Sequence, residues 1–354
     1  MASQAATALP PYPPMQRSVS VRPEDVHAPE EAPAEEYQRC VHQLFVEQAL
    51  RTPSEIAVVD VNGEMSYGKL HRLTDELAAY LKRRCGCVPE TVVGIFMERC
   101  SEYVVAYLAA LKAGSAYCPI ELAYPEKLVA KVFKSVDPIT TLTKAQHEAR
   151  IPQDAPRFCL DEGWAKNLPD YPEDLTILQQ EPQPTLESLI YVVYSGGSTG
   201  EPKGIEATHR SPTASYLWRL SISGYRVGAR VGCNVFFVWE CLRPLLRGGA
   251  CIVIPDDVIF DTAAVTAFLH KYEITEVLFT PSLLESIMNT GASSKPGELS
   301  AMLPKLQVIW FNGEVVTVKL LQEARRQLPR VSLLNTYSIS ECGEVSAVNL
   351  KEHR

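Results

Sequence analysis

Residues 195–204 combine small, hydroxyl and cationic side chains in a way that suits a polyphosphate. The segment reads Ser-Gly-Gly-Ser-Thr-Gly-Glu-Pro-Lys-Gly. Its glycines let backbone N–H groups converge, and the hydroxyls of Ser195, Ser198 and Thr199 add donors. Lys203 adds positive charge but stands between a proline and a glycine, so the loop is not a Walker A motif. A flexible surface loop is the alternative; the preceding apolar run, Leu-Ile-Tyr-Val-Val-Tyr, predicts a buried strand and favours phosphate binding.

Residues 191–204 resemble the phosphate-loop signature of the ANL superfamily of adenylate-forming enzymes, Tyr-Thr-Ser-Gly-Thr/Ser-Thr-Gly-x-Pro-Lys-Gly. Ser195 stands for the Thr and Gly196 for the Ser. Other segments in the expected order resemble motifs of nonribosomal peptide synthetase adenylation domains; they are residues 65–70, 111–120 with 123–126, 311–314 and 335–341. The similarity runs from about residue 40 to the end of the sequence, and five ordered motifs make it specific.

The resemblance implies an α/β fold, namely the large N-terminal domain of the adenylate-forming enzymes, with layered α-β-α subdomains and mostly parallel sheets. It also implies ATP-dependent activation of a carboxylic acid to an acyl-adenylate, for transfer to the phosphopantetheine of a carrier protein. In the family, a ribose-binding Asp, a hinge and a small domain with a catalytic Lys follow the last motif, whereas this sequence stops at Arg354. We therefore expect residues 37–354 to form a partial AMP-binding domain that turns over little alone. Residues 1–36, rich in Pro, Ala and Glu, predict a disordered leader.

The resemblance also assigns roles to residues around the nucleotide. Thr199, Lys203 and Glu341 would be catalytic, and Glu341 would hold Mg²⁺, for which one carboxylate with phosphate oxygens and water suffices. Tyr337 would stack on the adenine. The residues expected to bind ATP are Ser195, Gly196, Gly197, Ser198, Thr199, Gly200, Lys203, Asn335, Tyr337 and Ser340. The alternatives are a solvated loop acid for Glu341 and core packing for Tyr337.

Two features of these motifs leave their roles open. Ser338, Ile339 and Ser340 replace the usual Gly, Pro and Thr. Ser340 keeps a hydroxyl for the α-phosphate, but the loss of Gly and Pro predicts a reshaped turn. His209 follows the phosphate loop, where a His is frequent in the family. A structural role and a role near the active site are equally favoured for it.

The substrate segment departs further from the family pattern. Adenylation domains for α-amino acids place an Asp against the substrate ammonium, and Val235 stands at that position. A buried ammonium without a counter-charge is costly, so a standard α-amino acid is not expected. The substrate positions, by alignment of motifs, are Val235, Phe236, Trp239, Leu278, Trp310, Asn312, Thr336, Glu344 and Val345. Three aromatic residues and one acid resemble a cage for a quaternary ammonium, as in a betaine. The alternative is an apolar pocket for an aryl or aliphatic acid.

The elements that must position these residues alternate between strands and helices. Short apolar runs predict strands at 56–60, 92–96, 116–120, 250–254, 276–279, 308–311 and 332–335. Between the strands at 56–60 and 92–96, Leu73, Leu77, Tyr80 and Leu81 share one helical face that ends before Gly86. Residues 103–112, before the strand at 116–120, predict a second helix. This alternation favours largely parallel sheets. Residues 142–186, with many Pro, Asp and Glu, predict an irregular surface connection.

Composition excludes several classes of function. The net charge of −8 argues against nucleic acid or an anionic membrane as the main partner, and no apolar run approaches the ~20 residues of a membrane helix. The ten cysteines show no zinc spacing and predict reduced thiols in a cytoplasmic protein. Two functions besides carrier loading remain: an acyl-CoA ligase, which shares the phosphate loop, and a truncated, non-catalytic nucleotide-binding module.

Overall fold

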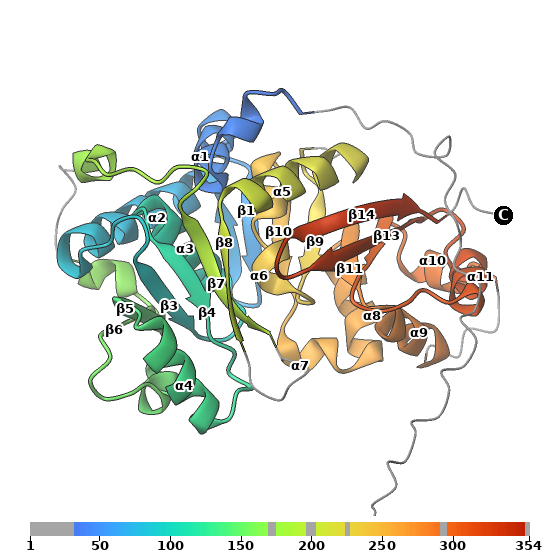
Figure 1. Cartoon of the computed structure of the whole chain (residues 1–354). Helices are drawn as coiled ribbons and strands as arrows, with labels where there is room; N and C mark the ends of the chain where they lie inside the picture. Colours follow the sequence, from blue (N-terminus) through green and yellow to red (C-terminus); the bar gives the residue numbers. More distant parts are fainter. Residues whose placement is uncertain (1–31, 169–174, 196–202, 224–226, 291–295, 351–354) are drawn as a thin grey trace, which may run out of the picture.

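The strands form two sheets in the part of the chain that the structure, a computed structural model, describes: residues 32–168, 175–195, 203–223, 227–290 and 296–350 (Figure 1). The eight-stranded sheet has the order β14-β13-β12-β11-β9-β10-β1-β2, and the six-stranded sheet the order β6-β5-β3-β4-β7-β8. Neighbouring strands are parallel except in the pairs β1–β2, β13–β14 and β7–β8. The expected α/β fold with mostly parallel sheets is confirmed.

The strands are β1 Ile56–Asp60, β2 Gly63–Ser66, β3 Val92–Phe96, β4 Ala116–Pro119, β5 Thr140–Thr143, β6 Arg157–Cys159, β7 Leu189–Ser195, β8 Lys203–Thr208, β9 Arg230–Cys233, β10 Ala250–Val253, β11 Glu276–Phe279, β12 Val308–Phe311, β13 Ser332–Ile339 and β14 Gly343–Asn349. The helices are α1 Val41–Arg51, α2 Tyr67–Tyr80, α3 Ser101–Lys112, α4 Glu126–Val136, α5 Arg210–Ser223, α6 Phe237–Glu240, α7 Asp256–Ile259, α8 Thr262–Lys271, α9 Pro281–Thr290, α10 Glu298–Met302 and α11 Val318–Gln327.

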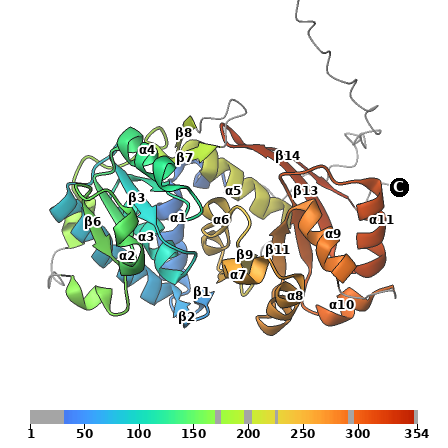
Figure 2. The ribbon, with the colours of Figure 1, turned by 90° about the horizontal axis from the view of Figure 1, so that it is seen from below.

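Helix α3 lies between the two sheets. It contacts β3 and β4 of the smaller sheet and β1 of the larger one, and all of its residues except Glu102 are buried. A helix that is apolar all round needs such a position, because no face of it can be left to water. Helix α4 covers the outer face of the smaller sheet, and α8, α9 and α11 cover the outer face of the larger one (Figures 1 and 2).

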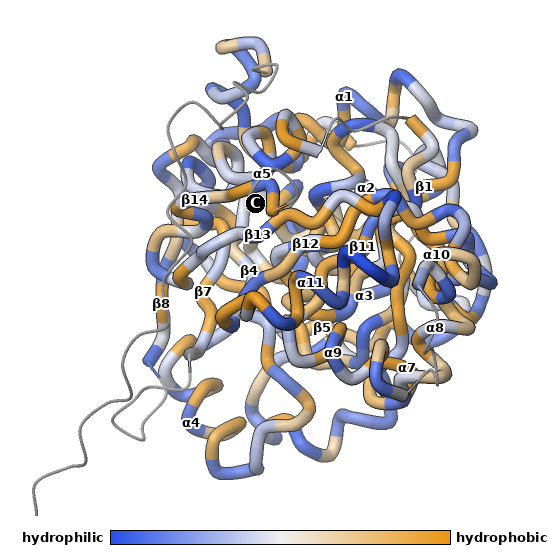
Figure 3. The backbone as a smooth tube through the Cα atoms, turned by 90° about the vertical axis from the view of Figure 1, so that its right-hand side faces the viewer, coloured by the Kyte–Doolittle hydropathy of each residue, from blue (hydrophilic) through white to orange (hydrophobic). Residues whose placement is uncertain are grey.

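Strand β12 shows how the larger sheet is packed on both faces. Ile309 and Phe311 point to the cluster formed with the outer helices, whereas Trp310 points to the opposite side, where it packs with Leu278 and Leu334. Alternate side chains of a strand point to opposite faces, so a strand covered on both sides is apolar throughout. The strands in the middle of the molecule are accordingly coloured as hydrophobic (Figure 3).

Residues 142–186 contain more regular structure than the sequence predicts. Strands β5 and β6 pair in parallel and complete one edge of the smaller sheet. The prediction of an irregular connection was therefore wrong for residues 142–143 and 157–159. Strand β5 is Thr-Thr-Leu-Thr and is buried throughout; β-branched threonine suits a strand, and its hydroxyl can bond to a nearby carbonyl. Thr143 illustrates this, since its Oγ1 donates to the carbonyl of Phe96 at 2.6 Å.

The chain is described from Ala32 onward, so most of the expected leader, residues 1–36, lies outside the described residues. Ala32 packs against the main hydrophobic cluster, and Glu36 forms an ion pair with Arg247. The last residues of the expected leader are thus attached to the folded domain. None of the described helices is both long and apolar enough to cross a membrane.

Candidate active site

The segments expected to form the site meet at the carboxyl ends of the parallel strands of the larger sheet. Leu278 lies near the end of β11, Asn312 and Gly313 follow β12, and Ser338 lies near the end of β13. Ligands bind at this edge of open α/β sheets, because the loops that leave the strands are free to differ there. Helices α5 and α6 close the opposite side of the site.

These elements enclose a cavity of about 340 Å³, a size suited to a small ligand. Its lining residues are Tyr191, Ser211, Pro212, Ser215, Tyr216, Arg219, Phe236, Trp239, Glu240, Leu278, Asn312, Gly313, Ser338, Ile339, Ser340, Gly343 and Glu344. Five of the substrate positions predicted from the sequence are among them, namely Phe236, Trp239, Leu278, Asn312 and Glu344. The structure thus brings together residues that are more than a hundred positions apart in the sequence.

The other four predicted substrate positions do not line this cavity. Val235 is half-buried and packs against the apolar clusters of the larger sheet, and Val345 is 55% exposed on β14. Thr336 is buried beneath the cavity with its hydroxyl unpartnered. Trp310 is fully buried, and the guanidinium of Arg219 lies over its ring at 4.5 Å. The protein's own cation therefore occupies a face of the Trp310 ring, which was expected to contact the substrate.

Aromatic rings nevertheless form one wall of the cavity. Trp239 lies edge-on to Phe236, with ring centroids 6.1 Å apart, and edge-on to Tyr191, with centroids 6.4 Å apart. Phe236 has a left-handed backbone, with φ of +53°, at the start of α6. Gly313 leaves room for it: a Cβ on this glycine would lie 3.0 Å from the Phe236 ring. The third aromatic residue of this wall is Tyr191, whereas the sequence predicted Trp310.

The end of β13 carries the residues expected to contact the nucleoside. Tyr337 is 60% exposed, and the Oδ1 atom of Asn335 is buried without a hydrogen-bond partner. The register shifts between Tyr337 and Ser338, which turns Ser338 toward Asn312, whose Nδ2 donates to the Ser338 hydroxyl at 2.8 Å. A buried, unpartnered oxygen beside an exposed aromatic ring suits a planar base with hydrogen-bond donors.

Ser338 and Ile339, which stand in place of the usual Gly and Pro, both belong to strand β13. Strand β13 continues to Ile339, which pairs with Gly343 of β14, so Ser340, Glu341 and Cys342 form a tight turn between two paired strands. Glu341 and Cys342 are exposed, and Ser340 lines the cavity. The turn is attached to α5, because the hydroxyl of Ser211 donates to the carbonyl of Cys342 at 3.1 Å. An exposed carboxylate in this turn is open to a hydrated cation such as Mg²⁺.

The expected phosphate loop connects β7 to β8. Ser195 and Lys203 pair across the antiparallel ladder, and Lys203 is exposed. Gly196, Gly197, Ser198, Thr199 and Gly200 lie outside the described residues. Gly204 allows close packing of the two strands, since a Cβ there would lie 3.3 Å from the ring of Tyr194.

His209 lies in the core rather than in the cavity. It is 1% exposed, and its ring lies edge-on to that of His42 with centroids 5.5 Å apart. The Nδ1 atoms of both rings are buried without a partner. Burial lowers the pKa of His209 to about 4, because the charged imidazolium is disfavoured away from water. The geometry favours the structural role over the one near the active site.

Sequence reasoning missed Arg219, the cation at the bottom of the cavity. Its Nη1 donates to Glu240 and, at 3.0 Å, to Oε1 of Glu344, and its Nη2 donates to Glu240 at 3.3 Å. Arg219 lies in α5, outside every motif, so no local signal marks it. Glu240 directly follows Trp239 in the sequence, but its pairing with a distant arginine is revealed only by the fold.

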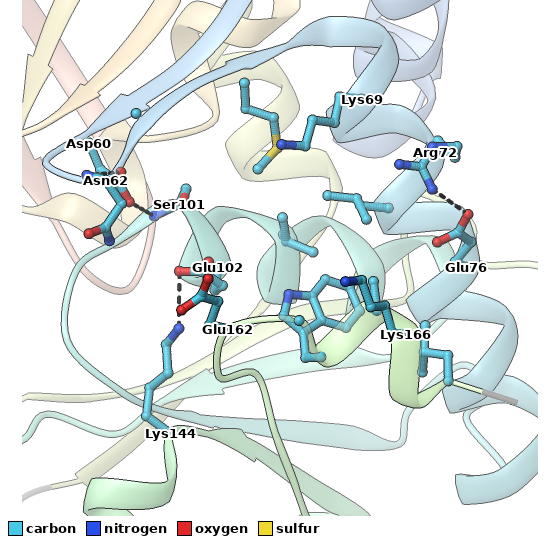
Figure 4. A pocket seen from close by; sticks show the side chains of 18 of the residues that line it. Asp60, Asn62, Lys69, Arg72, Glu76, Ser101, Glu102, Lys144, Glu162 and Lys166 are labelled. Carbon is cyan, nitrogen blue, oxygen red and sulfur yellow. Dashed lines mark hydrogen bonds and ion pairs between the residues drawn. The ribbon is translucent and has the colours of Figure 1, made fainter.

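A larger cavity of about 1110 Å³ lies elsewhere, between the β1–β2 hairpin, α2 and the start of α3 (Figure 4). Several of its charged side chains already have partners in the protein. Lys144 pairs with Glu102, Arg72 pairs with Glu76, and Asp60 accepts from the backbone N–H of Ser101 (Figure 4). Of the sequence motifs, residues 65–70 alone reach the described lining of this cavity, through Met65 and Lys69, so we assign the function to the smaller cavity.

A cavity of small-molecule size at the carboxyl ends of parallel strands, with mixed aromatic and ionic walls, is typical of ligand-binding α/β proteins. Comparison with known proteins narrows this class. Residues 45–354 match the family model described as AMP-binding enzyme, and the chain belongs to that family. It is a nonribosomal peptide synthetase-like adenylation domain, and enzymes of this superfamily are adenylate-forming ligases.

Two curated relatives illustrate the similarity. The glycine betaine reductase ATRR of Emericella nidulans is 38% identical over 87% of this chain, which covers 24% of that protein. The dimodular nonribosomal peptide synthase of Bacillus subtilis is 32% identical over 85% of this chain, which covers 13% of that protein. The chain thus spans a quarter or less of the length of these relatives.

Solved structures support the fold. The nonribosomal peptide synthetase FmoA3, bound to α-methyl-L-serine-AMP, has a TM-score of 0.77 at 22% identity and aligns over 91% of this chain and 35% of that chain. The N-terminal subdomain of Klebsiella oxytoca NpsA, in complex with 3-hydroxybenzoyl-AMSN, has a TM-score of 0.74 at 18% identity over 90% of this chain and 77% of that chain. The observed sheets are those of adenylation-domain N-terminal regions.

Proposed function

We propose that this protein activates a small carboxylic acid bearing a quaternary ammonium, such as a betaine, and passes the acyl group to the phosphopantetheine of a carrier domain. In this reaction a carboxylate oxygen attacks the α-phosphorus of ATP, an acyl–phosphate bond forms, and pyrophosphate leaves. The phosphopantetheine thiol then attacks the acyl carbon, a thioester forms, the acyl–phosphate bond breaks, and AMP leaves. The observation that carries the substrate class is the aromatic wall of Tyr191, Trp239 and Phe236. A quaternary ammonium cannot donate hydrogen bonds and is bound well by aromatic faces.

The residues near the wall fit this acid better than an α-amino acid. Val235 offers no carboxylate, and both oxygens of Glu240 already accept from arginines. A primary ammonium placed against the aromatic wall would lose its water and could not gain Glu240 as an acceptor, because both oxygens of that carboxylate are already engaged. The glycine betaine reductase of Emericella nidulans, which is 38% identical, bears in its name the substrate class that we infer.

The residues available to the nucleotide fit ATP. Lys203 and the hydroxyl-rich segment that precedes it are assigned to the outer phosphates, Ser340 to the α-phosphate, and Tyr337 with Asn335 to the adenosine. Mg²⁺, when bound, would neutralise phosphate charge, and Glu341 would hold it. Because chemistry of this kind depends on positioning and charge neutralisation, the chain's own part is to orient the acid and nucleotide.

Acid-dependent exchange of pyrophosphate into ATP tests the proposal; because residues 37–354 are expected to turn over little alone, relative rates are compared at high protein concentration. Glycine betaine should support exchange at least about tenfold faster than glycine, other α-amino acids or benzoate, in line with cation–π contacts of ~2 kcal/mol. Equilibrium binding of Mg·ATP is measured in parallel, so that nucleotide binding is recorded separately from turnover. Glu341→Ala should abolish exchange, whereas Glu285→Ala, an exposed acid on α9, should not. Preference for an α-amino acid would refute the proposal.

A further inference from the structure

Three charged residues among the described lining of the cavity form one connected cluster. Arg219 of α5 contacts Glu240 at the end of α6 and Glu344 of β14. Their side chains are 1%, 3% and 11% exposed, so Glu344 is the most accessible of the three. One guanidinium faces two carboxylates, which leaves a formal charge of −1 at the cavity.

A second pair behind the cluster does not cancel this charge. Arg243 donates to Glu240 at 2.6 Å and to Glu276 at 2.9 Å, and Glu276 also accepts from the Trp310 indole at 2.8 Å. Arg243 and Glu276 together add no net charge. Burial alone would raise the pKa of Glu240, but attraction to Arg219 and Arg243 outweighs it and lowers that pKa. The carboxylate therefore stays ionised at neutral pH.

The cluster offers negative potential but few hydrogen-bond acceptors. Both oxygens of Glu240 and one oxygen of Glu344 are engaged by arginines. Potential acts on any cation, and in a partly buried site it is screened less than at the surface. Acceptors, by contrast, are needed by an ammonium that carries N–H groups and are not needed by a trimethylammonium. The arrangement therefore matches a permanent cation.

We propose that Arg219, Glu240 and Glu344 select the charge of the acid: their residual negative charge attracts a permanently cationic substrate, and Arg219 sets how much of that charge reaches the cavity. The inference deepens the proposed function and rests on it. It assigns specificity to an ionic cluster on α5, α6 and β14, in addition to the aromatic wall. Arg219 also covers a face of the Trp310 ring, so we assign the cation–π contact with the substrate to the rings of the aromatic wall.

A pair of matched acids separates charge from shape. Glycine betaine and 3,3-dimethylbutanoate have the same branching, but a carbon replaces the charged nitrogen in the second acid. In the unmodified protein we expect kcat/KM for pyrophosphate exchange to be at least about tenfold higher for the betaine. Glu344→Gln removes one charge at a partly exposed position, so the fold should survive. The ratio of the two kcat/KM values should fall by about tenfold, because kcat/KM for the betaine falls and that for 3,3-dimethylbutanoate does not.

Further variants make the outcome decisive. Glu344→Asp keeps the charge and should restore most of the ratio, and Glu285→Gln, on the distant helix α9, should leave it unchanged. Equal losses for both acids in Glu344→Gln would mean that Glu344 only shapes the pocket and would overturn the inference. An unchanged ratio would overturn it too. Exchange with neither acid in the unmodified protein would overturn the proposed function, and the inference with it.

Discussion

His209 is a neutral imidazole buried against another imidazole, and this has a cost at low pH. Its pKa in the folded protein is about 4, below the ordinary value of 6.5, because burial disfavours the charged ring. Burial first, and then the neighbouring His209 and Lys112, also lower the pKa of His42. A group whose pKa is depressed on folding stabilises the protein above its unfolded pKa, and this stabilisation is lost as the pH falls.

We therefore expect the free energy of unfolding to fall steeply between pH 6.5 and pH 4, with a contribution of about 3 kcal/mol from His209. Urea unfolding at several pH values measures it. His209→Gln, which cannot take up a proton, should make the decline shallower. His270→Gln, at an exposed position on α8, is the control and should not alter it. A decline of equal slope in all three proteins would show that His209 is not the titrating group.

The sequence identified single residues best where a motif surrounds them. Phe236, Trp239, Asn312 and Glu344 were placed in the cavity by alignment to ordered motifs, and all four line it. Trp310 is absent from the described lining of the cavity; alignment gives a position but not the neighbour that covers the ring. That neighbour, Arg219, comes from a helix with no motif, and its burial between two acids depends on tertiary packing. A charged residue in a helix is ordinarily solvated, so nothing local distinguishes Arg219.

Among the elements, strands with long apolar or β-branched runs were predictable. The runs at 92–96, 276–279 and 308–311 are strands β3, β11 and β12 with the predicted ends. Strand β13 was predicted to stop at Asn335 but continues to Ile339, because β14 provides backbone partners that the sequence alone does not reveal. Strands β5 and β6 were hidden by the polar composition around them. The end of β13 and the existence of β5 and β6 therefore depend on pairing with neighbouring strands, which the local sequence pattern does not reveal.

The β13–β14 hairpin gives a prediction for an element. Gly343 has a φ of +76°, and a Cβ there would lie 3.1 Å from the Oγ of Ser211. Gly343→Ala should strain the backbone by about 1–2 kcal/mol and displace the turn that carries Glu341, which depends on the bond from Ser211. Pyrophosphate exchange should fall by about tenfold or more, since misplacement of this kind is costly.

Gly297→Ala is the matched control for that variant. Gly297 has a φ of +78° at the start of α10, and nothing lies within 4 Å of a Cβ built there. This substitution carries the same backbone strain without touching the hairpin. Both variants should lose similar stability in urea, but only Gly343→Ala should lose activity. Loss of activity in both would attribute the effect to general destabilisation.

In the whole molecule, the two sheets share one hydrophobic cluster. It contains Val58 and Cys251 of the larger sheet together with Ile95 and Tyr117 of the smaller one. On the side of the larger sheet, Tyr67 at the start of α2 donates from its hydroxyl to the carbonyl of Gly249, just before β10, at 2.6 Å. Neither sheet can therefore separate from the other without exposing apolar surface, and cooperative unfolding is expected.

Tryptophan fluorescence can test this coupling. Trp164 packs beside the smaller sheet and Trp310 lies in the larger one. Two variants are made, each of which keeps one of these tryptophans and has Phe in place of the other three. In each variant, the urea midpoint measured by fluorescence should equal the midpoint measured by circular dichroism. Distinct fluorescence and dichroism transitions within one variant would mean that the sheets unfold independently.

The turn that carries Glu341 also carries a thiol, and this exposes the site to covalent chemistry. All ten cysteines lie in the described part of the chain; seven are buried, Cys85 and Cys159 are half-buried, and Cys342 is exposed. Burial raises the pKa of the Cys85 and Cys159 thiols, that of Cys159 to about 11, which makes them poor nucleophiles. An electrophile or oxidant therefore meets Cys342 first. A fluorescent maleimide attached there would sit one residue from Glu341, as a reporter of occupancy that leaves the buried thiols untouched.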